Sequence, residues 1–130
     1  MYTFTVNTSQ GIVSVRTTQS SGKPVFFLHG NSACKEVFTK QFSHFGREYR
    51  LYAMDLPGHG ESQNSKEPNA TYNINGYADV ALEVIQKLNL ENPVLVGWSL
   101  GGHIALSMVQ KGLKVAGVLI TGTPPIPMSK

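Results

Sequence analysis

The sequence has a single cysteine and no long apolar run, which argues against a disulfide-stabilised protein and against a membrane-spanning one. Cys34 is the only cysteine among 130 residues, so no disulfide can form within the chain and no cysteine pair is present to bind zinc. No apolar segment approaches the length of a membrane span, and residues 1–6 lack the pattern of a signal peptide. We therefore expect a cytoplasmic protein with no membrane partner and no metal site.

Charged residues are also sparse, and they form no cluster. Eleven basic and eight acidic residues give a net charge of +3, and charged residues make up 15% of the chain. Because no basic run or stripe could follow a phosphate backbone, nucleic-acid binding is not expected. The hydrophobic content of 41% is ordinary for a globular protein, so residues 1–130 are expected to form a single domain.

The segment from Val94 to Gln110 carries the most chemical information. Val94-Leu95-Val96 is an apolar strand pattern, Gly97-Trp98-Ser99-Leu100-Gly101 follows it, and Leu100–Gln110 is typical of a largely apolar helix. The two glycines permit a tight reversal from strand to helix that leaves the serine hydroxyl projecting from the turn. This is the pattern of a nucleophile elbow, and it makes Ser99 the candidate nucleophile. The alternative is a tight turn whose serine only caps the helix.

The glycine-rich turns do not match nucleotide-binding motifs. Gly97 and Gly102 have the spacing of a phosphate-binding loop, but His103 and Ile104 occupy the positions where that loop needs Lys and then Ser or Thr. Neither this turn nor the one at residues 58–60 supplies the G-x-G-x-x-G pattern of a dinucleotide site. No cofactor is expected.

Hydrophobic periodicity predicts strands that alternate with helices. An antiparallel hairpin of residues 2–6 and 12–18 is expected first, then strands at 24–28, 49–54, 94–96 and 115–120, with helices at 33–45, 77–88 and 100–110. Ser32 is the expected N-cap of the first helix and Gly46 its expected end. Residues 63–73 are expected to form an exposed loop, and residues 121–130 a proline-rich tail.

This alternation indicates an α/β fold in which a mostly parallel sheet carries helices on both faces and the hairpin precedes it. The strand at 24–28 is expected near the centre of the sheet because it is apolar throughout. Loops that follow parallel strands gather at one edge of the sheet, where ligands bind. Three glycine-containing loops, at residues 29–32, 55–62 and 97–102, should therefore meet there.

With these loops the sequence resembles the α/β-hydrolase family over about residues 24–125. The motifs are His29-Gly30-Asn31-Ser32, Asp55-Leu-Pro-Gly-His-Gly-Glu-Ser62 and Gly97-Trp-Ser-Leu-Gly-Gly102, in the family's order. The resemblance implies that Ser99 is the nucleophile and that the backbone N–H groups of Asn31 and Leu100 form the oxyanion hole. Trp98 and Ser32 are candidates for the substrate pocket, and a place in the core is the alternative for Trp98.

The resemblance does not extend to the acid and the base. In this family the nucleophile is followed by Asp or Glu and then by His. All eight acidic residues precede Ser99, and the one histidine that follows it, His103, lies one turn along the same helix and matches a packing position. We therefore expect an incomplete domain, truncated after the strand at 115–120. That strand would be an exposed edge through which the chain self-associates or pairs with a complementing chain.

The sequence thus favours a serine hydrolase that acts on a small-molecule carboxylic ester through Ser99. Two alternatives stay open. One is a catalytically inactive fragment or interaction module that retains the nucleophile elbow. The other is slow ester hydrolysis by Ser99 and the oxyanion hole alone, because binding and hydrogen-bond donors retain some rate when a triad member is missing.

Overall fold

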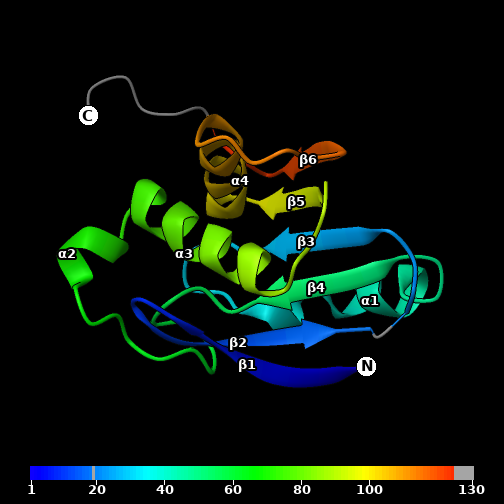
Figure 1. The fold of residues 1–130 in the computed structure, drawn as a ribbon, viewed down its shortest axis with the longest axis horizontal. Coiled ribbons are helices and arrows are strands. Elements are labelled where there is room, and N and C mark those ends of the chain that lie inside the picture. Colours follow the sequence, from blue (N-terminus) through cyan, green and yellow to red (C-terminus); the bar gives the residue numbers. More distant parts are fainter. Residues whose placement is uncertain (19, 125–130) are drawn as a thin grey trace.

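A computed structural model describes residues 1–18 and 20–124 of the chain (Figure 1). Their centre is a six-stranded sheet in the order β1-β2-β4-β3-β5-β6. The strands are β1 (Tyr2–Thr8), β2 (Gly11–Thr17), β3 (Pro24–Leu28), β4 (Arg50–Met54), β5 (Val94–Trp98) and β6 (Gly117–Thr121). The helical segments are the 3₁₀ turn η1 (Lys35–Phe38) and the helices α1 (Thr39–Phe45), α2 (Pro68–Thr71), α3 (Ile74–Lys87) and α4 (Leu100–Gln110).

The sheet is antiparallel at its N-terminal side and parallel elsewhere. β1 pairs with β2 and β2 with β4 in antiparallel fashion, whereas β3 pairs in parallel with both β4 and β5, and β5 in parallel with β6. In this register Phe26 lies beside Tyr52 on one side and beside Leu95 on the other. The predicted hairpin, the mostly parallel sheet and the interior position of the strand at 24–28 are all confirmed.

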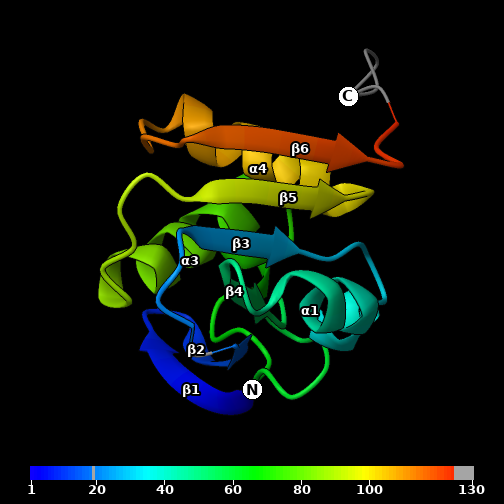
Figure 2. The same cartoon turned by 90° about the vertical axis from the view of Figure 1, so that its right-hand side faces the viewer.

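Helices cover both faces of the sheet, as the sequence predicts. Figure 2 shows η1 and α1 on one face and α3 and α4 on the other. Side chains alternate between the faces, so Phe26 lies in the core beneath α3 and α4, whereas Phe27 packs with Phe38 and Phe42 of η1 and α1. Burial on both faces explains why β3 is apolar throughout.

The prediction for the start of the first helix is wrong. Ser32 does not cap it: its φ is 61°, η1 begins only at Lys35, and the N-cap residue is Cys34. The backbone N–H of Lys35 donates instead to the side chain of Asp55 at 2.7 Å. The acceptor for this N–H at the start of η1 is therefore a carboxylate 20 residues away in the chain, and not the side chain of a neighbouring residue. Gly46 is the C-cap of α1, as predicted.

The prediction of an exposed loop at residues 63–73 is also wrong in part. The short helix α2 lies within this segment and begins at Pro68, a favourable first position because proline has no N–H to leave unpaired. Ser65 and Thr71 are buried, and the Ser65 hydroxyl donates to Thr71 Oγ1 at 2.7 Å. This segment is therefore tied to the domain by polar contacts that hydrophobic periodicity does not detect.

The remaining boundaries differ from the predictions by a few residues. The strand predicted at 115–120 is β6, which begins at Gly117 and ends at Thr121. It lies at the edge of the sheet and pairs with β5. The rest of the predicted tail, residues 125–130, lies outside the described part. None of the helices within the described ranges combines the length and the apolar character that a membrane span requires.

Candidate active site

Ser99 occupies the turn between β5 and α4, as the elbow pattern predicts. Its backbone has φ 57° and ψ −121°, a strained conformation for a residue with a Cβ that costs on the order of 1–3 kcal/mol. The glycines around it allow β5 and α4 to approach each other, because a Cβ on Gly97 would lie 2.4 Å from the carbonyl oxygen of Gly101. The sequence around Ser99 therefore permits a turn that ordinary side chains would block.

The end of β6 holds this strained turn in place. The backbone N–H of Ser99 donates to the carbonyl oxygen of Thr121 at 2.9 Å. The carbonyl oxygen of Ser99 accepts from the hydroxyl of Thr123 at 2.8 Å and from the backbone N–H of Gly102 at 2.9 Å. Both backbone polar groups of Ser99 are thus paired, which stabilises a conformation that would otherwise relax.

The side chain of Ser99 does not cap α4. It makes no capping hydrogen bond to α4, and the residue is only half-buried. Leu100 is the first residue of α4, so its N–H is one of the donors that have no partner inside the helix. The positive end of an 11-residue helix therefore begins at the residue next to Ser99.

The loop after β3 passes directly against the elbow. A Cβ on Gly30 would lie 3.1 Å from the Cβ of Ser99 and 3.3 Å from the carbonyl oxygen of Trp98. Asn31 is the next residue and is exposed, so it stands one peptide unit from this contact. The structure thus brings together two loops that are 68 residues apart in the chain, which is the pairing that the predicted oxyanion hole requires.

The two residues predicted for the substrate pocket lie in different surroundings. Trp98 is 40% exposed and borders a hollow of about 330 Å³ on the α1 side of the sheet. Ser32 is exposed and does not belong to the lining of that hollow. Trp98 and Ser99 are neighbours on a strand end, so their side chains leave the backbone in different directions.

His29 braces the loop that carries Gly30 and Asn31. The side chain is fully buried, its Nε2 accepts from the backbone N–H of Leu56 at 3.0 Å, and its Nδ1 lies 2.6 Å from the carbonyl oxygen of Gly30. Because the N–H of Leu56 can only donate, Nε2 carries no proton and Nδ1 is the donor to Gly30. Burial lowers the pKa of His29 below its usual value.

We expect His29 to make the stability of the fold sensitive to mild acid. Its pKa is lower in the folded chain than the 6.5 of an unperturbed histidine, so stability is full above pH 6.5 and is lost as the pH falls toward the folded value. Urea unfolding should therefore give a smaller free energy of unfolding near pH 5.5 than near pH 7.5. His29→Gln should flatten this dependence, whereas His44→Gln, at an exposed position, should retain it. An equally steep dependence in His29→Gln would contradict this account.

A buried ion pair joins the loop after β3 to the turn after β4. Lys35 Nζ lies 2.7 Å from Asp55 Oδ2, and both side chains are inaccessible to solvent. Asp55 also accepts from the backbone N–H groups of Lys35 at 2.7 Å and Glu61 at 2.9 Å. Although burial alone would lower the pKa of Lys35, its hydrogen bonds to Asp55 and Glu61 raise it above the usual value. Lys35 is therefore charged at neutral pH.

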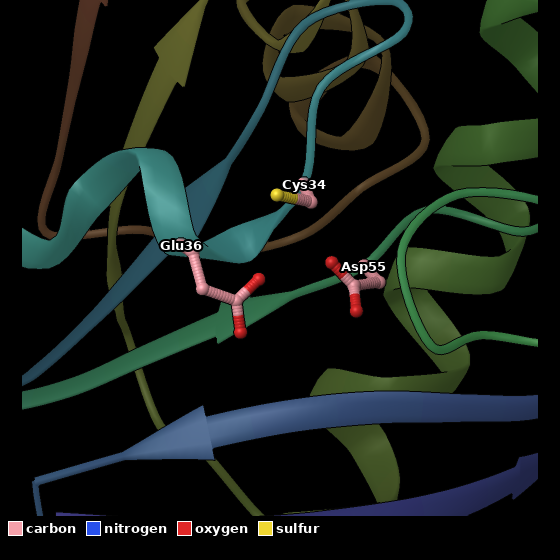
Figure 3. A group of neighbouring side chains, drawn as sticks. All are labelled: Cys34, Glu36 and Asp55. Atoms are coloured by element: carbon pink, nitrogen blue, oxygen red, sulfur yellow. The ribbon is translucent and has the colours of Figure 1, made fainter.

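Cys34, Glu36 and Asp55 form the group whose donor atoms could be taken for a metal site (Figure 3). The figure shows them converging from the loop before η1, from η1 itself and from the end of β4, and their donor atoms lie within 4.8 Å of one another. However, Lys35 Nζ lies 2.7 Å from Asp55 and 3.2 Å from Glu36, so an ammonium group already supplies the positive charge. The proximity of these side chains is therefore better explained by the ion pairs of Asp55 and Glu36 with Lys35 than by a metal site.

His103 is buried on α4, and its Nδ1 has no hydrogen-bond partner among residues 1–18 and 20–124. It is one helical turn beyond Ser99, and side chains on a helix lean toward its N-terminus. Among the described residues no hydrogen bond joins His103 to Ser99. The structure therefore gives no support for His103 as a catalytic base.

Sequence reasoning missed three residues that shape this region. Thr121 and Thr123 were grouped with the tail, although they pair with the backbone of Ser99. Lys35 was not identified as important from the sequence, although its side chain is fully buried and forms an ion pair with Asp55. The sequence held two indirect signals. Asp55 directly follows a buried strand, so its carboxylate needs a hydrogen-bonding or charged partner. Thr121-Gly-Thr123 comes at the end of an apolar strand, as the other loops at this edge of the sheet do.

Comparison with known proteins identifies a family. The family model described as "alpha/beta hydrolase fold" matches residues 23–130. The solved structure of N-acyl homoserine lactonase AidH, complexed with N-butanoyl homoserine, superposes with a TM-score of 0.93 at 39% sequence identity. That match covers 97% of this chain and 46% of the lactonase.

Curated relatives give the same picture. The AB hydrolase superfamily protein YisY of Bacillus subtilis is 37% identical over 86 residues, which are 65% of this chain and 31% of that protein. The (E)-2-((N-methylformamido)methylene)succinate hydrolase of Acinetobacter baylyi is 32% identical over 97 residues, or 75% of this chain and 34% of that enzyme. The chain thus spans less than half the length of these proteins and corresponds to their N-terminal portion.

Proposed function

Because the chain belongs to the α/β-hydrolase family, we propose that it carries the nucleophile of a serine hydrolase that cleaves carboxylic esters, and that this nucleophile is Ser99. The observation that carries the proposal is the turn itself. Ser99 is strained at φ 57°, is held by the end of β6, and has a hydroxyl that does not cap the helix behind it. A turn that served only to connect β5 with α4 would not need this strain.

The proposed step is acyl transfer to Ser99. The Ser99 oxygen forms a bond to the carbonyl carbon of the ester while its proton passes to a general base. The bond from that carbon to the alcohol oxygen then breaks, and the departing alcohol takes up the proton. Water attacks the acyl-serine in the same way and releases the acid.

The charge that develops on the carbonyl oxygen needs donors that are already in position. We assign this role to the backbone N–H groups of Leu100 and Asn31. The first lies at the N-terminus of α4, and the second follows Gly30, which touches the elbow. A donor of this kind lowers the barrier by about 3 kcal/mol.

The substrate class that the relatives favour is a lactone or a simple ester. N-acyl homoserine lactonase, at 39% identity, is by name an enzyme that acts on a lactone, and a lactone is a cyclic ester. Its cleavage uses the same step, except that the departing alcohol stays attached to the acid. Trp98 and Ser32 are the residues of this chain that we propose for the substrate pocket.

The acid and the base of this proposed enzyme come from outside these 130 residues. No Asp or Glu follows Ser99 in the chain, and His103 is buried and forms no hydrogen bond with Ser99 among the residues that the structure describes. Since the family places both groups after the nucleophile, we propose that they lie on the portion of the domain that the chain does not match.

A chimera tests the proposal. The chain is fused to the C-terminal part of N-acyl homoserine lactonase, which supplies the missing portion, and is treated with a fluorophosphonate probe. Mass spectrometry should find the probe on Ser99, and the chimera should open an N-acyl homoserine lactone. The 130-residue chain alone should react with the probe at least about 1,000-fold more slowly, because it lacks the base.

Two serine variants of the chimera make the result specific. Ser99→Ala should abolish both labelling and lactone opening, whereas Ser107→Ala, on the same helix, should retain both. A chimera that folds by circular dichroism but is labelled at another residue, or not at all, would exclude Ser99 as the nucleophile.

The second candidate function is an interaction module that retains the elbow without catalysis, and the exposed edge at β6 favours it. The two candidates differ in the chimera experiment, because only the first predicts labelling. For either one we propose a cytoplasmic location, supported by the single cysteine, which is compatible with a reducing compartment.

A further inference from the structure

A hollow of about 620 Å³ lies at the end of the sheet opposite to Ser99. β4 and β5 both run parallel to β3 (Figure 1). Arg50 begins β4 and Ser99 follows the end of β5, so the hollow and the candidate active site lie at opposite ends of the strands. We call this space the Arg50 hollow, and the residues that line it include Tyr2, Phe4, Arg50, Tyr52 and Leu88.

The pairing of the strands explains why aromatic residues gather on one wall of the Arg50 hollow. Thr17 of β2 pairs with Tyr2 of β1 on one side and with Tyr52 of β4 on the other, so these three residues form a row across the sheet. Phe4 lies two residues after Tyr2 and therefore faces the same way, with the two ring centroids 5.6 Å apart. The row gives the hollow a wall that can pack against a flat apolar ligand.

The side chain of Arg50 brings a positive charge to this wall. Among the described residues that line the hollow, Arg50 is the only charged one. Its guanidinium forms no hydrogen bond and no ion pair with residues 1–18 and 20–124, although its Nε is buried. Nε is the only atom of the group that is both buried and unpaired, so the two terminal nitrogens are open to solvent. An anion bound at those nitrogens would offset the desolvation of the whole delocalised group.

Tyr52 holds the guanidinium in position. The Cζ atom of Arg50 lies 5.9 Å from the centroid of the Tyr52 ring, which is a cation–π contact. The two residues are two apart on β4, so their side chains lie on the same face of the sheet. A guanidinium held on a ring loses little freedom when it binds a ligand, and its planar N–H groups match the two oxygens of a carboxylate.

The walls of the Arg50 hollow favour an organic anion with a flat apolar part. One guanidinium balances one negative charge, so a polyanion such as a nucleic acid would meet no further cation among the described lining residues. An inorganic anion would reach Arg50 but would leave the aromatic wall in water. A carboxylate joined to a ring uses both features of the hollow, whose volume lies in the range of small-molecule sites.

We propose that the Arg50 hollow is a binding site for a small aromatic carboxylate. The two carboxylate oxygens accept hydrogen bonds from the terminal nitrogens of Arg50, and the ring packs against Tyr2 and Phe4. Binding involves no covalent step. The site lies away from Ser99, so it does not depend on the proposed hydrolase activity.

Titration with 4-fluorobenzoate tests the site. The ligand is added to the 130-residue chain labelled with nitrogen-15, and the fluorine resonance of the ligand is followed together with the Nε–H resonances of the three arginines, Arg16, Arg47 and Arg50. Arg16→Lys and Arg47→Met identify two of these resonances, so that of Arg50 is assigned without altering it. We expect saturable binding that moves the Arg50 resonance most. Saturation that leaves this resonance unmoved, or no saturable binding, would overturn the proposal.

Variants of Arg50 measure what its side chain contributes. Arg50→Met keeps the apolar stem without the charge and should weaken binding at least about tenfold, and Arg50→Lys, which keeps the charge without the planar fork, at least about fivefold. Arg47→Met is the matched control: it removes the same charge at an exposed position outside the lining and should bind normally. Equal losses in Arg47→Met and Arg50→Met would mean that binding follows the net charge of the chain, which would contradict a site at Arg50.

Two further ligands test the chemical class. 4-Fluorobenzyl alcohol has the ring without the charge, and acetate, followed through the Arg50 resonance, has the carboxylate without the ring; each should bind at least about tenfold more weakly than 4-fluorobenzoate. Acetate that binds as tightly as 4-fluorobenzoate would rule out an aromatic carboxylate as the ligand. None of these measurements uses the nucleophile, so the failure of this proposal and the failure of the proposed function are separate results.

Discussion

Replacing Asp55 with alanine is expected to lower the free energy of unfolding by about 3–5 kcal/mol, because it leaves a buried ammonium group without its main partner. Lys35 Nζ and Asp55 Oδ2 are 2.7 Å apart, and neither side chain is accessible to solvent. The backbone N–H groups of Lys35 and Glu61 would lose their acceptor as well. Urea unfolding at neutral pH measures the effect.

Two further variants show whether burial causes the loss. Asp79→Ala breaks an ion pair of similar length, 2.9 Å to Lys111, but that pair is exposed, so the change should be within about 1 kcal/mol. The double variant Lys35→Met, Asp55→Leu removes both charges and should recover much of the stability that Asp55→Ala loses. If Asp55→Ala were no more harmful than Asp79→Ala, the buried pair would not stabilise the two loops.

The architecture could be predicted from the sequence because the signals were local and repeated. The alternation of buried runs with helical spacing gave the strand and helix order, and the apolar run at residues 24–28 gave the interior position of β3. The apolar face of α3 follows from its spacing of Tyr77, Val80, Ala81 and Val84. These patterns could be recognised because each element must place apolar side chains on the face that it buries.

The errors lie where distant polar groups replace local signals. Ser32 has the residue type of an N-cap, but the segment is held by Asp55, which is 20 residues beyond Lys35 in the chain. In the same way Ser65 and Thr71 are polar residues that a loop prediction leaves exposed, and they are buried through a hydrogen bond with each other. The sequence alone does not reveal these hydrogen-bond partners, because they become neighbours only in the folded chain.

The candidate site also has a part that local sequence predicts and a part that depends on distant residues. The position of Ser99 at the elbow followed from two glycines and the strand and helix around them, all within a few residues. The hydrogen bonds that hold the elbow come from Thr121 and Thr123, beyond a whole helix and strand. Sequence spacing located the proposed nucleophile, whereas only the parallel pairing of β5 with β6 revealed the residues that hold its backbone.

Gly101→Ala is expected to lower the free energy of unfolding by about 3 kcal/mol, because α4 lies directly on the end of β3 at this point. A Cβ at Gly101 would stand 2.0 Å from the carbonyl oxygen of Leu28 and 2.8 Å from that of His29. Both are backbone atoms, one at the end of β3 and the other in the loop that carries the proposed oxyanion donor, so neither can rotate away as a side chain could, and the helix must move.

The matched control for this change is Gly117→Ala at the start of β6, where a Cβ would meet nothing within 4 Å and the backbone is not in the left-handed region. Its effect on stability should be within about 1 kcal/mol. In the chimera, Gly101→Ala should also abolish probe labelling of Ser99, since moving α4 displaces the N–H of Leu100, while Gly117→Ala should label normally. A stable Gly101→Ala variant that labels at the usual rate would mean that the close contact between α4 and β3 does not position the nucleophile.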